Sequence, residues 1–119
     1  MPDPAPTDPV PPLSPAAFHI LVALADDDRH GYAIMRDIAE LSGGLVRMGS
    51  GTLYGSIKRM LDQGLIEEAD ERPDPALDDQ RRRYYRITPR GRAAARAEAR
   101  RLQQLVELAR AHGIVPARA

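Results

Sequence analysis

Residues 30–64 read HGYAIMRDIAELSGGLVRMGSGTLYGSIKRMLDQG, and this stretch decides the fold. Apolar side chains recur every three or four positions over about 30–42 and again over about 51–63, which is the spacing of amphipathic helices. Between the two helices stand Gly43 and Gly44, which end the first helix because glycine adopts a left-handed backbone at little cost. Two short helices joined by a glycine-containing turn predict a helix-turn-helix.

The second of these helices is expected to begin at a Ser50 cap and to end at Gly64. Its apolar side chains follow the spacing i, i+4, i+7 and i+8, which predicts a buried face made of Leu53, Ile57, Met60 and Leu61. The first helix is apolar over a wide arc, so it is expected to pack on two sides.

A third helix is predicted upstream of this pair, with Ser14 as its cap and Pro15 at its first position. Its apolar stripe is expected to be formed by Phe18, Leu21, Val22 and Ala25, widened by Ile20 and Leu24. The acidic run at 26–28 is expected to end it. Residues 1–12, MPDPAPTDPVPP, are rich in proline and predict a disordered tail.

The periodicity changes after Gly64. A short strand is predicted over 65–68, a polar loop over 69–80, and a second strand over 83–88, where side chains alternate between two faces. Two strands joined in this way form a hairpin. A hairpin that directly follows the second helix of a helix-turn-helix is a wing.

The last helix is predicted from a Thr88 cap, with Pro89 at its first position, to about His112. It would be about 35 Å long at 1.5 Å per residue. A three-helix core is too small to cover so long an apolar stripe, so the distal half is expected to pack on a second copy of the chain. Folding back on its own core is the alternative. The predicted dimer-interface residues are Ala95, Ala99, Leu102, Leu105, Val106 and Ala109.

The predicted fold class is therefore mainly α with a small β-hairpin. A disordered tail over 1–12 precedes a winged helix-turn-helix domain over 13–88. A dimerisation helix over 89–112 and a flexible tail over 113–119 follow.

Charge is distributed unevenly along a chain that is formally neutral, with 17 basic and 17 acidic residues. Acids gather at 26–28 and at 67–79, whereas 81–101 holds nine arginines and a single acid, Glu98. A neutral chain with such a cluster still has a local positive field. Arginine also suits contacts to phosphate and guanine.

Several classes of protein are disfavoured by composition and spacing. No cysteine is present, so disulfides and thiolate metal sites are excluded. The three histidines have no metal-ligand spacing, and no phosphate loop or Ser-His-Asp set is evident. No apolar run approaches about 18 residues, the length of a membrane span. We therefore expect a cytoplasmic protein that is not an enzyme and has no metal, cofactor or membrane partner.

Double-stranded DNA is the expected partner of the polar face of the helix predicted over 51–63. Small residues there allow close approach to the major groove, and hydroxyl, guanidinium and ammonium groups donate to bases or phosphates. An ordinary solvated face is the alternative. The wing arginines are expected to contact phosphates or a narrow minor groove. The alternative is that they are merely solvated or paired with Asp78 and Asp79. Tyr32, at a helix start, is either a phosphate donor or a core residue. The predicted DNA-contacting residues are Tyr32, Ser50, Thr52, Tyr54, Ser56, Lys58, Arg59, Arg81, Arg82 and Arg83.

An ordered set of motifs resembles the PadR family of bacterial transcriptional regulators over residues 13–112. The motifs are His30-Gly31-Tyr32-Ala33-Ile34, Gly51-Thr52-Leu53-Tyr54, Gly64-Leu65-Ile66, and Arg83-Tyr84-Tyr85-Arg86-Ile87-Thr88 with Gly91. The resemblance implies a winged helix-turn-helix, an antiparallel dimer formed by the last helix, and repression of a nearby operon that a small-molecule effector relieves. The chain is similar to the short subgroup, which has a single C-terminal helix.

One feature departs from that resemblance. Some short members stack planar drugs on Trp at the dimer interface, whereas this chain has no Trp and its last helix has no aromatic residue. An effector would instead bind among Phe18, Leu102, Leu105 and Val106. The competing hypotheses are a winged-helix module that binds proteins rather than DNA, which the acidic wing favours, and, least favoured, an enzyme.

Overall fold

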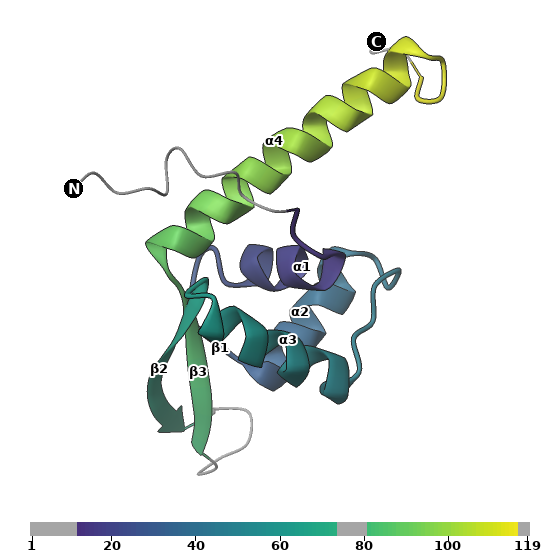
Figure 1. Ribbon diagram of the computed structural model, residues 1–119. Coiled ribbons are helices and arrows are strands. Elements are labelled where there is room, and N and C mark those ends of the chain that lie inside the picture. Colours follow the sequence, from purple (N-terminus) through teal and green to yellow (C-terminus); the bar gives the residue numbers. More distant parts are fainter. Residues whose placement is uncertain (1–11, 74–80, 117–119) are drawn as a thin grey trace, which may run out of the picture.

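The chain folds into three packed helices, a small antiparallel sheet and a long C-terminal helix (Figure 1). The structure, a computed structural model, describes residues 12–73 and 81–116. Most of the two predicted tails and the tip of the predicted wing loop lie outside these residues. In order, the elements are α1 (Pro15–Ala23), β1 (Arg29–His30), α2 (Gly31–Leu41), α3 (Ser50–Asp62), β2 (Ile66–Pro73), β3 (Arg81–Ile87) and α4 (Pro89–Ala111). The predicted fold class is confirmed.

Local capping chemistry sets several of these boundaries. The Ser14 Oγ accepts a hydrogen bond from the Ala17 N–H at 3.1 Å, and the Thr88 Oγ1 accepts one from the Gly91 N–H at 2.9 Å, as the sequence predicts. The helices α2, α3 and α4 end before glycines with positive φ, among them Gly64 at 74°. The predicted end of α1 is wrong, because that helix stops at Ala23, before the acidic run.

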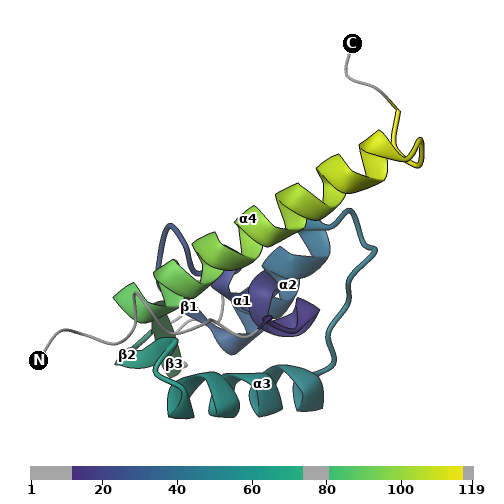
Figure 2. The same ribbon diagram turned by 45° about the horizontal axis from the view of Figure 1, so that its top comes forward.

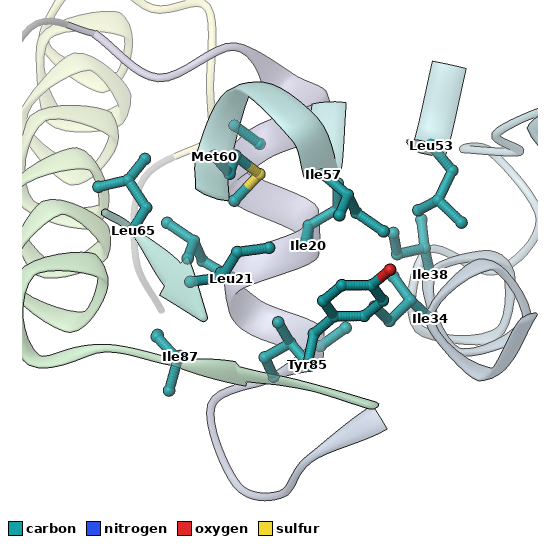
Figure 3. Close-up of a cluster of buried hydrophobic side chains, with 14 of the residues drawn as sticks. Ile20, Leu21, Ile34, Ile38, Leu53, Ile57, Met60, Leu65, Tyr85 and Ile87 are labelled. Carbon is teal, nitrogen blue, oxygen red and sulfur yellow. The ribbon is translucent and has the colours of Figure 1, made fainter. Parts of the chain in front are cut away.

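The core lies where α1, α2, α3 and the sheet meet (Figure 3). Its largest fully buried side chains are Ile20, Leu21, Leu24, Ile34, Ile38, Leu53, Met60 and Ile66. Each contributes roughly 1.5–3 kcal/mol by leaving water. Burial among these side chains also raises the pKa of the Tyr85 phenol, and nearby Tyr54 and Glu68 act in the same direction.

Two predictions about helix faces are wrong. The buried side of α1 is formed by Ala17, Ile20, Leu21 and Leu24, whereas Val22 is exposed and Phe18 is only half-buried. The helix α2 packs on α1, α3 and the sheet through Ile34 and Ile38, but the side that carries Tyr32 is not buried, and Leu41 at the end of the helix is 68% exposed. Both errors have one cause. The apolar residues of a helix are compatible with more than one buried face, and the positions of the neighbouring helices decide which face is buried.

The sheet has the strand order β1-β3-β2, and every pairing is antiparallel. The strand β1 was not predicted, because two residues that pair with Tyr84 and Tyr85 leave no pattern in the sequence. The predicted loop is too long, since β2 continues to Pro73 after a register shift between Glu68 and Glu71. On the other side of β3, the Arg86 guanidinium binds both carboxylate oxygens of Asp28, at 3.2 and 3.0 Å. The acidic run therefore anchors the sheet.

The helix α4 starts on the core and then leaves it. Its first turns pack against α1, and their buried residues include Gly91, Ala94 and Glu98. The Glu98 carboxylate accepts hydrogen bonds from the Leu13 N–H, at 2.9 Å, and from Arg101. The distal half projects past the other helices in both views, so it does not fold back on its own core (Figures 1 and 2). Within 12–73 and 81–116, no helix combines the length and the apolar character that crossing a membrane requires.

Candidate nucleic-acid interface

The helix α3 lies on the side of the molecule opposite α4, with α1 and α2 between them (Figure 2), and its exposed residues are mostly polar. Leu53, Ile57 and Met60 are at most 2% exposed and hold this helix against the core. Side chains on the other side of the helix consequently point to solvent. The exposed residues that the sequence predicted on this surface are Ser50, Thr52, Tyr54, Lys58 and Arg59.

Ser56 is a correction to that predicted surface. It is 3% exposed, and its Oγ lies 3.3 Å from Nη2 of Arg59, which donates to it. The buried residues of α3 therefore follow the spacing i, i+3, i+4 and i+7 from Leu53, and Leu61, expected in that face, is only half-buried. A small hydroxyl residue in a helix gives no apolar signal, so the sequence pattern placed Ser56 on the wrong side. Its side chain is covered by the rest of the chain and is not exposed on this surface.

The predicted Ser50 cap is also wrong. The N-cap of α3 is Gly49, and no side chain caps this helix end. Ser50 is instead the first residue of the helix and is exposed. Its hydroxyl lies at the start of the polar face rather than over the free backbone N–H groups.

The start of α2 lies beside the wing. His30 is buried and acts as N-cap, with its Nδ1 accepting a hydrogen bond from the Ala33 N–H at 3.2 Å. The Tyr32 ring stacks on the His30 ring, with 6.5 Å between centroids, and is 52% exposed. Because about half of its side chain is exposed, Tyr32 is not a core residue, and the interpretation as a phosphate donor is the one that stays open. The Arg82 guanidinium of β3 lies 5.8 Å from the Tyr32 ring centroid, within cation–π range.

The start of α2 contacts α3 at Gly31. A Cβ placed on Gly31 would lie 2.3 Å from the Tyr54 Oη, so a larger residue at this position would displace that phenol. Tyr54 is therefore partly fixed by α2 while it remains 46% exposed. In the sequence Gly31 stands out only as part of a motif. Its contact with Tyr54 gives no sequence signal, because the two residues belong to different helices.

The wing arginines differ in their surroundings. The Arg83 Nη1 lies 3.5 Å from the Glu68 Oε2, and both side chains are about half exposed. A pair in such a position contributes little to stability, so it leaves the guanidinium able to change partner. Only the backbone of Arg81, at the start of β3, is described. Asp78 and Asp79, the alternative partners for these arginines, lie outside the described residues.

The candidate interface is thus formed by the exposed residues of α3, the start of α2 and the described wing arginines. It combines hydroxyl groups, two tyrosines and several cations on one side of the molecule. Such groups donate hydrogen bonds to phosphates and to base edges. Among the described residues, no three His, Cys, Asp or Glu side chains are grouped so as to hold a metal ion.

Sequence comparisons give a family and two relatives. A family model described as "Transcriptional regulator PadR-like family" matches residues 20–97. The transcriptional regulator Rv3488 of Mycobacterium tuberculosis is 38% identical over 88 residues, which are 74% of this chain and 76% of the relative. An uncharacterized 37.1 kDa protein in transposon TN4556 of Streptomyces fradiae is 36% identical over 90 residues, 76% of this chain. The match spans only 24% of that protein's length.

Solved structures show the same fold. A PadR family transcription regulator from Clostridium difficile aligns with a TM-score of 0.71 at 21% identity, over 83% of this chain and 98% of that one. The Bacillus subtilis PadR in complex with operator DNA aligns with a TM-score of 0.58 at 20% identity, over 68% of this chain and 44% of that one.

Proposed function

Because this chain belongs to the PadR-like family of transcriptional regulators, we propose that it binds double-stranded operator DNA as a homodimer and represses transcription. The observation that supports DNA binding best is the exposed polar face of α3, which has Lys58 and Arg59 near its C-terminal end. The wing formed by β2 and β3 lies next to this helix (Figure 1). The Bacillus subtilis PadR, which shares the fold, was solved in complex with operator DNA. Membership of a family of regulators confirms the prediction that the chain is not an enzyme.

In this proposal α3 enters the major groove. Thr52 and Tyr54 lie near the N-terminal end of the inserted face, while Lys58 and Arg59 reach base edges or phosphates at the other end. Tyr32 donates its hydroxyl to a phosphate near the start of α2. Arg82 and Arg83 contact the adjacent backbone or minor groove, where the negative potential is strongest in narrow segments.

The test is a fluorescence-anisotropy titration of the protein with the duplex that flanks its own gene. We expect submicromolar, sequence-selective binding that weakens steeply as salt rises, because each neutralised phosphate releases counterions. A matched duplex of scrambled sequence is the control. The hypothesis of a protein-binding module predicts no such binding, and this result would reject the proposed DNA-binding function.

The dimer is proposed from the distal half of α4. Leu102, Leu105 and Val106 are exposed there, at 39%, 60% and 44%. They continue the side of the helix whose earlier residues, Ala94 and Glu98, are buried against the rest of the chain. Exposed apolar side chains in such a row are typical of an interface between proteins. Two copies related by a two-fold axis would cover both rows at once.

Replacing Leu105 by glutamate tests this dimer. The wild type is expected to sediment as a dimer at micromolar concentration, and Leu105→Glu as a monomer, because a buried unpaired carboxylate is strongly unfavourable in an interface. The matched control is Gln104→Glu, which adds the same charge at the neighbouring position on another side of the helix. A wild-type monomer, or equal dimerisation of the two variants, would contradict the proposal.

We extend the proposal to relief of repression by a small-molecule effector. The support is chemical: Phe18 is half-buried on α1, which packs against the first turns of α4, and exposed apolar residues follow farther along that helix. An apolar ligand held there would touch both the DNA-binding domain and the proposed dimer helix.

A further inference from the structure

A hollow of about 570 Å³ lies on the outer side of α2, next to the connection that leads into α3. Its walls include Tyr32, Met35 and Arg36 from α2, with Arg47 and Met48 from the connection. Resting on the proposed function, we propose that this hollow receives the sugar–phosphate backbone of one DNA strand. Arg36 and Arg47 donate to its phosphates.

The position of the hollow favours a DNA strand. The residues that line it include Tyr32, in the first turn of α2, and Met48, two residues before α3 begins at Ser50. Both residues thus belong to, or directly adjoin, the candidate interface. A major groove that receives α3 has a phosphate strand along each side. The strand on the side of α2 would cross the hollow.

The charges around the hollow also fit a polyanion. The Arg36 side chain is 51% exposed, and its Nε lies 3.7 Å from Asp37 Oδ1. The other oxygen of that carboxylate is held more closely by Arg29, at 2.8 Å. Arg47 is exposed and has no ion pair or hydrogen bond from its guanidinium to any residue in 12–73 or 81–116. By contrast, Arg86 and Arg110 are held by carboxylates at 3.0 and 2.7 Å.

The shape of the hollow suits a polymer better than a small ligand. Small-molecule sites enclose most of their ligand's surface, whereas five of the residues lining this hollow, Tyr32, Arg36, Glu40, Gly43 and Arg47, are themselves exposed. Half-buried Met35 and Met48 offer apolar contact to deoxyribose. The rim at Gly43 has no side chain, and a Cβ built there meets nothing within 4 Å, so a backbone can approach closely.

Glu40 offers a test of whether the ligand of the hollow is negatively charged. It is the one carboxylate among the residues that line the hollow, and it is exposed. A phosphate in the hollow would be repelled by it. Glu40→Gln is therefore expected to strengthen DNA binding, while loss of either arginine weakens it.

The experiment measures affinity for the flanking duplex and for a scrambled duplex over a range of salt concentrations, using the full chain. Arg36→Ala and Arg47→Ala should each weaken binding to both duplexes by the same factor. Each should also reduce the slope of log K against log salt by about 1. The control is Arg96→Ala, which removes one exposed positive charge from α4 and should leave affinity and slope unchanged.

The outcomes separate this inference from the function on which it rests. If Arg36→Ala and Arg47→Ala behave like Arg96→Ala while Lys58→Ala with Arg59→Ala loses binding, the hollow is not a phosphate site and the proposed function stands. If the wild type binds neither duplex, both proposals fail. A loss confined to the specific duplex would mean base contact instead, and it would overturn the assignment to phosphate.

Discussion

Replacing Lys58 and Arg59 together by alanine is expected to lower the affinity for operator DNA by about a hundredfold. Each cation is exposed on the outer face of α3. A contact to a base or phosphate at such a position is worth about 1–3 kcal/mol, and two contacts near the lower end of this range, about 1.4 kcal/mol each, together correspond to that factor. The measurement is the anisotropy titration with the flanking duplex, at one fixed salt concentration.

The matched control is the double variant Arg96→Ala with Arg100→Ala. It removes the same two charges from exposed positions on α4, which lies on the other side of the molecule from α3. A general loss of electrostatic attraction would affect both double variants equally. Unchanged affinity of the Lys58 and Arg59 variant would remove α3 as the DNA-reading helix.

The single variants assign the two roles. A residue that contacts a base lowers binding to the flanking duplex more than to a scrambled one, whereas a residue that contacts phosphate lowers both equally. Arg59 has the better-defined geometry, because the buried Ser56 Oγ accepts a hydrogen bond from its guanidinium. We expect Arg59→Ala to reduce selectivity more than Lys58→Ala, since guanidinium groups bind guanine in a bidentate way.

Gly91→Ala is expected to destabilise the fold by about 3 kcal/mol. A Cβ at this buried position would lie 2.0 Å from the carbonyl oxygen of Leu65 and 2.9 Å from its carbonyl carbon. That oxygen also accepts the Thr88 N–H at 3.1 Å, so the backbone cannot move away without breaking the attachment of α4. Thermal unfolding should shift downward by roughly 10–20 °C for a domain of this size.

The control is Gly51→Ala, where a Cβ meets nothing within 4 Å. Alanine favours the helix over glycine by about 1 kcal/mol, so this variant should be as stable as the wild type or slightly more stable. A melting temperature of Gly91→Ala equal to that of Gly51→Ala would show that the turn after α3 yields easily. In that case the packing of Gly91 against this turn would not fix the direction of α4.

The sequence alone predicted the order of the elements well, and it predicted the candidate interface in outline. Local rules are sufficient where a residue acts on its own backbone: hydroxyl caps begin α1 and α4, and glycines with positive φ follow the ends of α2, α3 and α4. The alternation of side chains between two faces predicted most of β3, because residues on one side of a strand repeat every second position. These signals lie within a few residues of the feature that they predict.

The sequence could not predict how wide an arc of each helix is buried. Ser56 is covered and Leu41 is exposed, although their polarity suggests the reverse. Burial depends on where neighbouring helices lie, and a helix of mixed polarity fits more than one arrangement. For the same reason β1 went unpredicted, since its two residues form a strand only because β3 runs beside them.

For the outer face of α3, the sequence by itself therefore determined the helix, its glycine stop and the cations near its end. Only the tertiary structure decided which of those side chains reach solvent. It removed Ser56 from the surface, placed Tyr54 against Gly31, brought Arg82 over Tyr32, and opened the hollow beside Arg36 and Arg47. The physical reason is the distance along the sequence over which each interaction acts. Periodicity, caps and glycine stops act along neighbouring residues, whereas a surface is assembled from helices and strands that meet only once the core has packed.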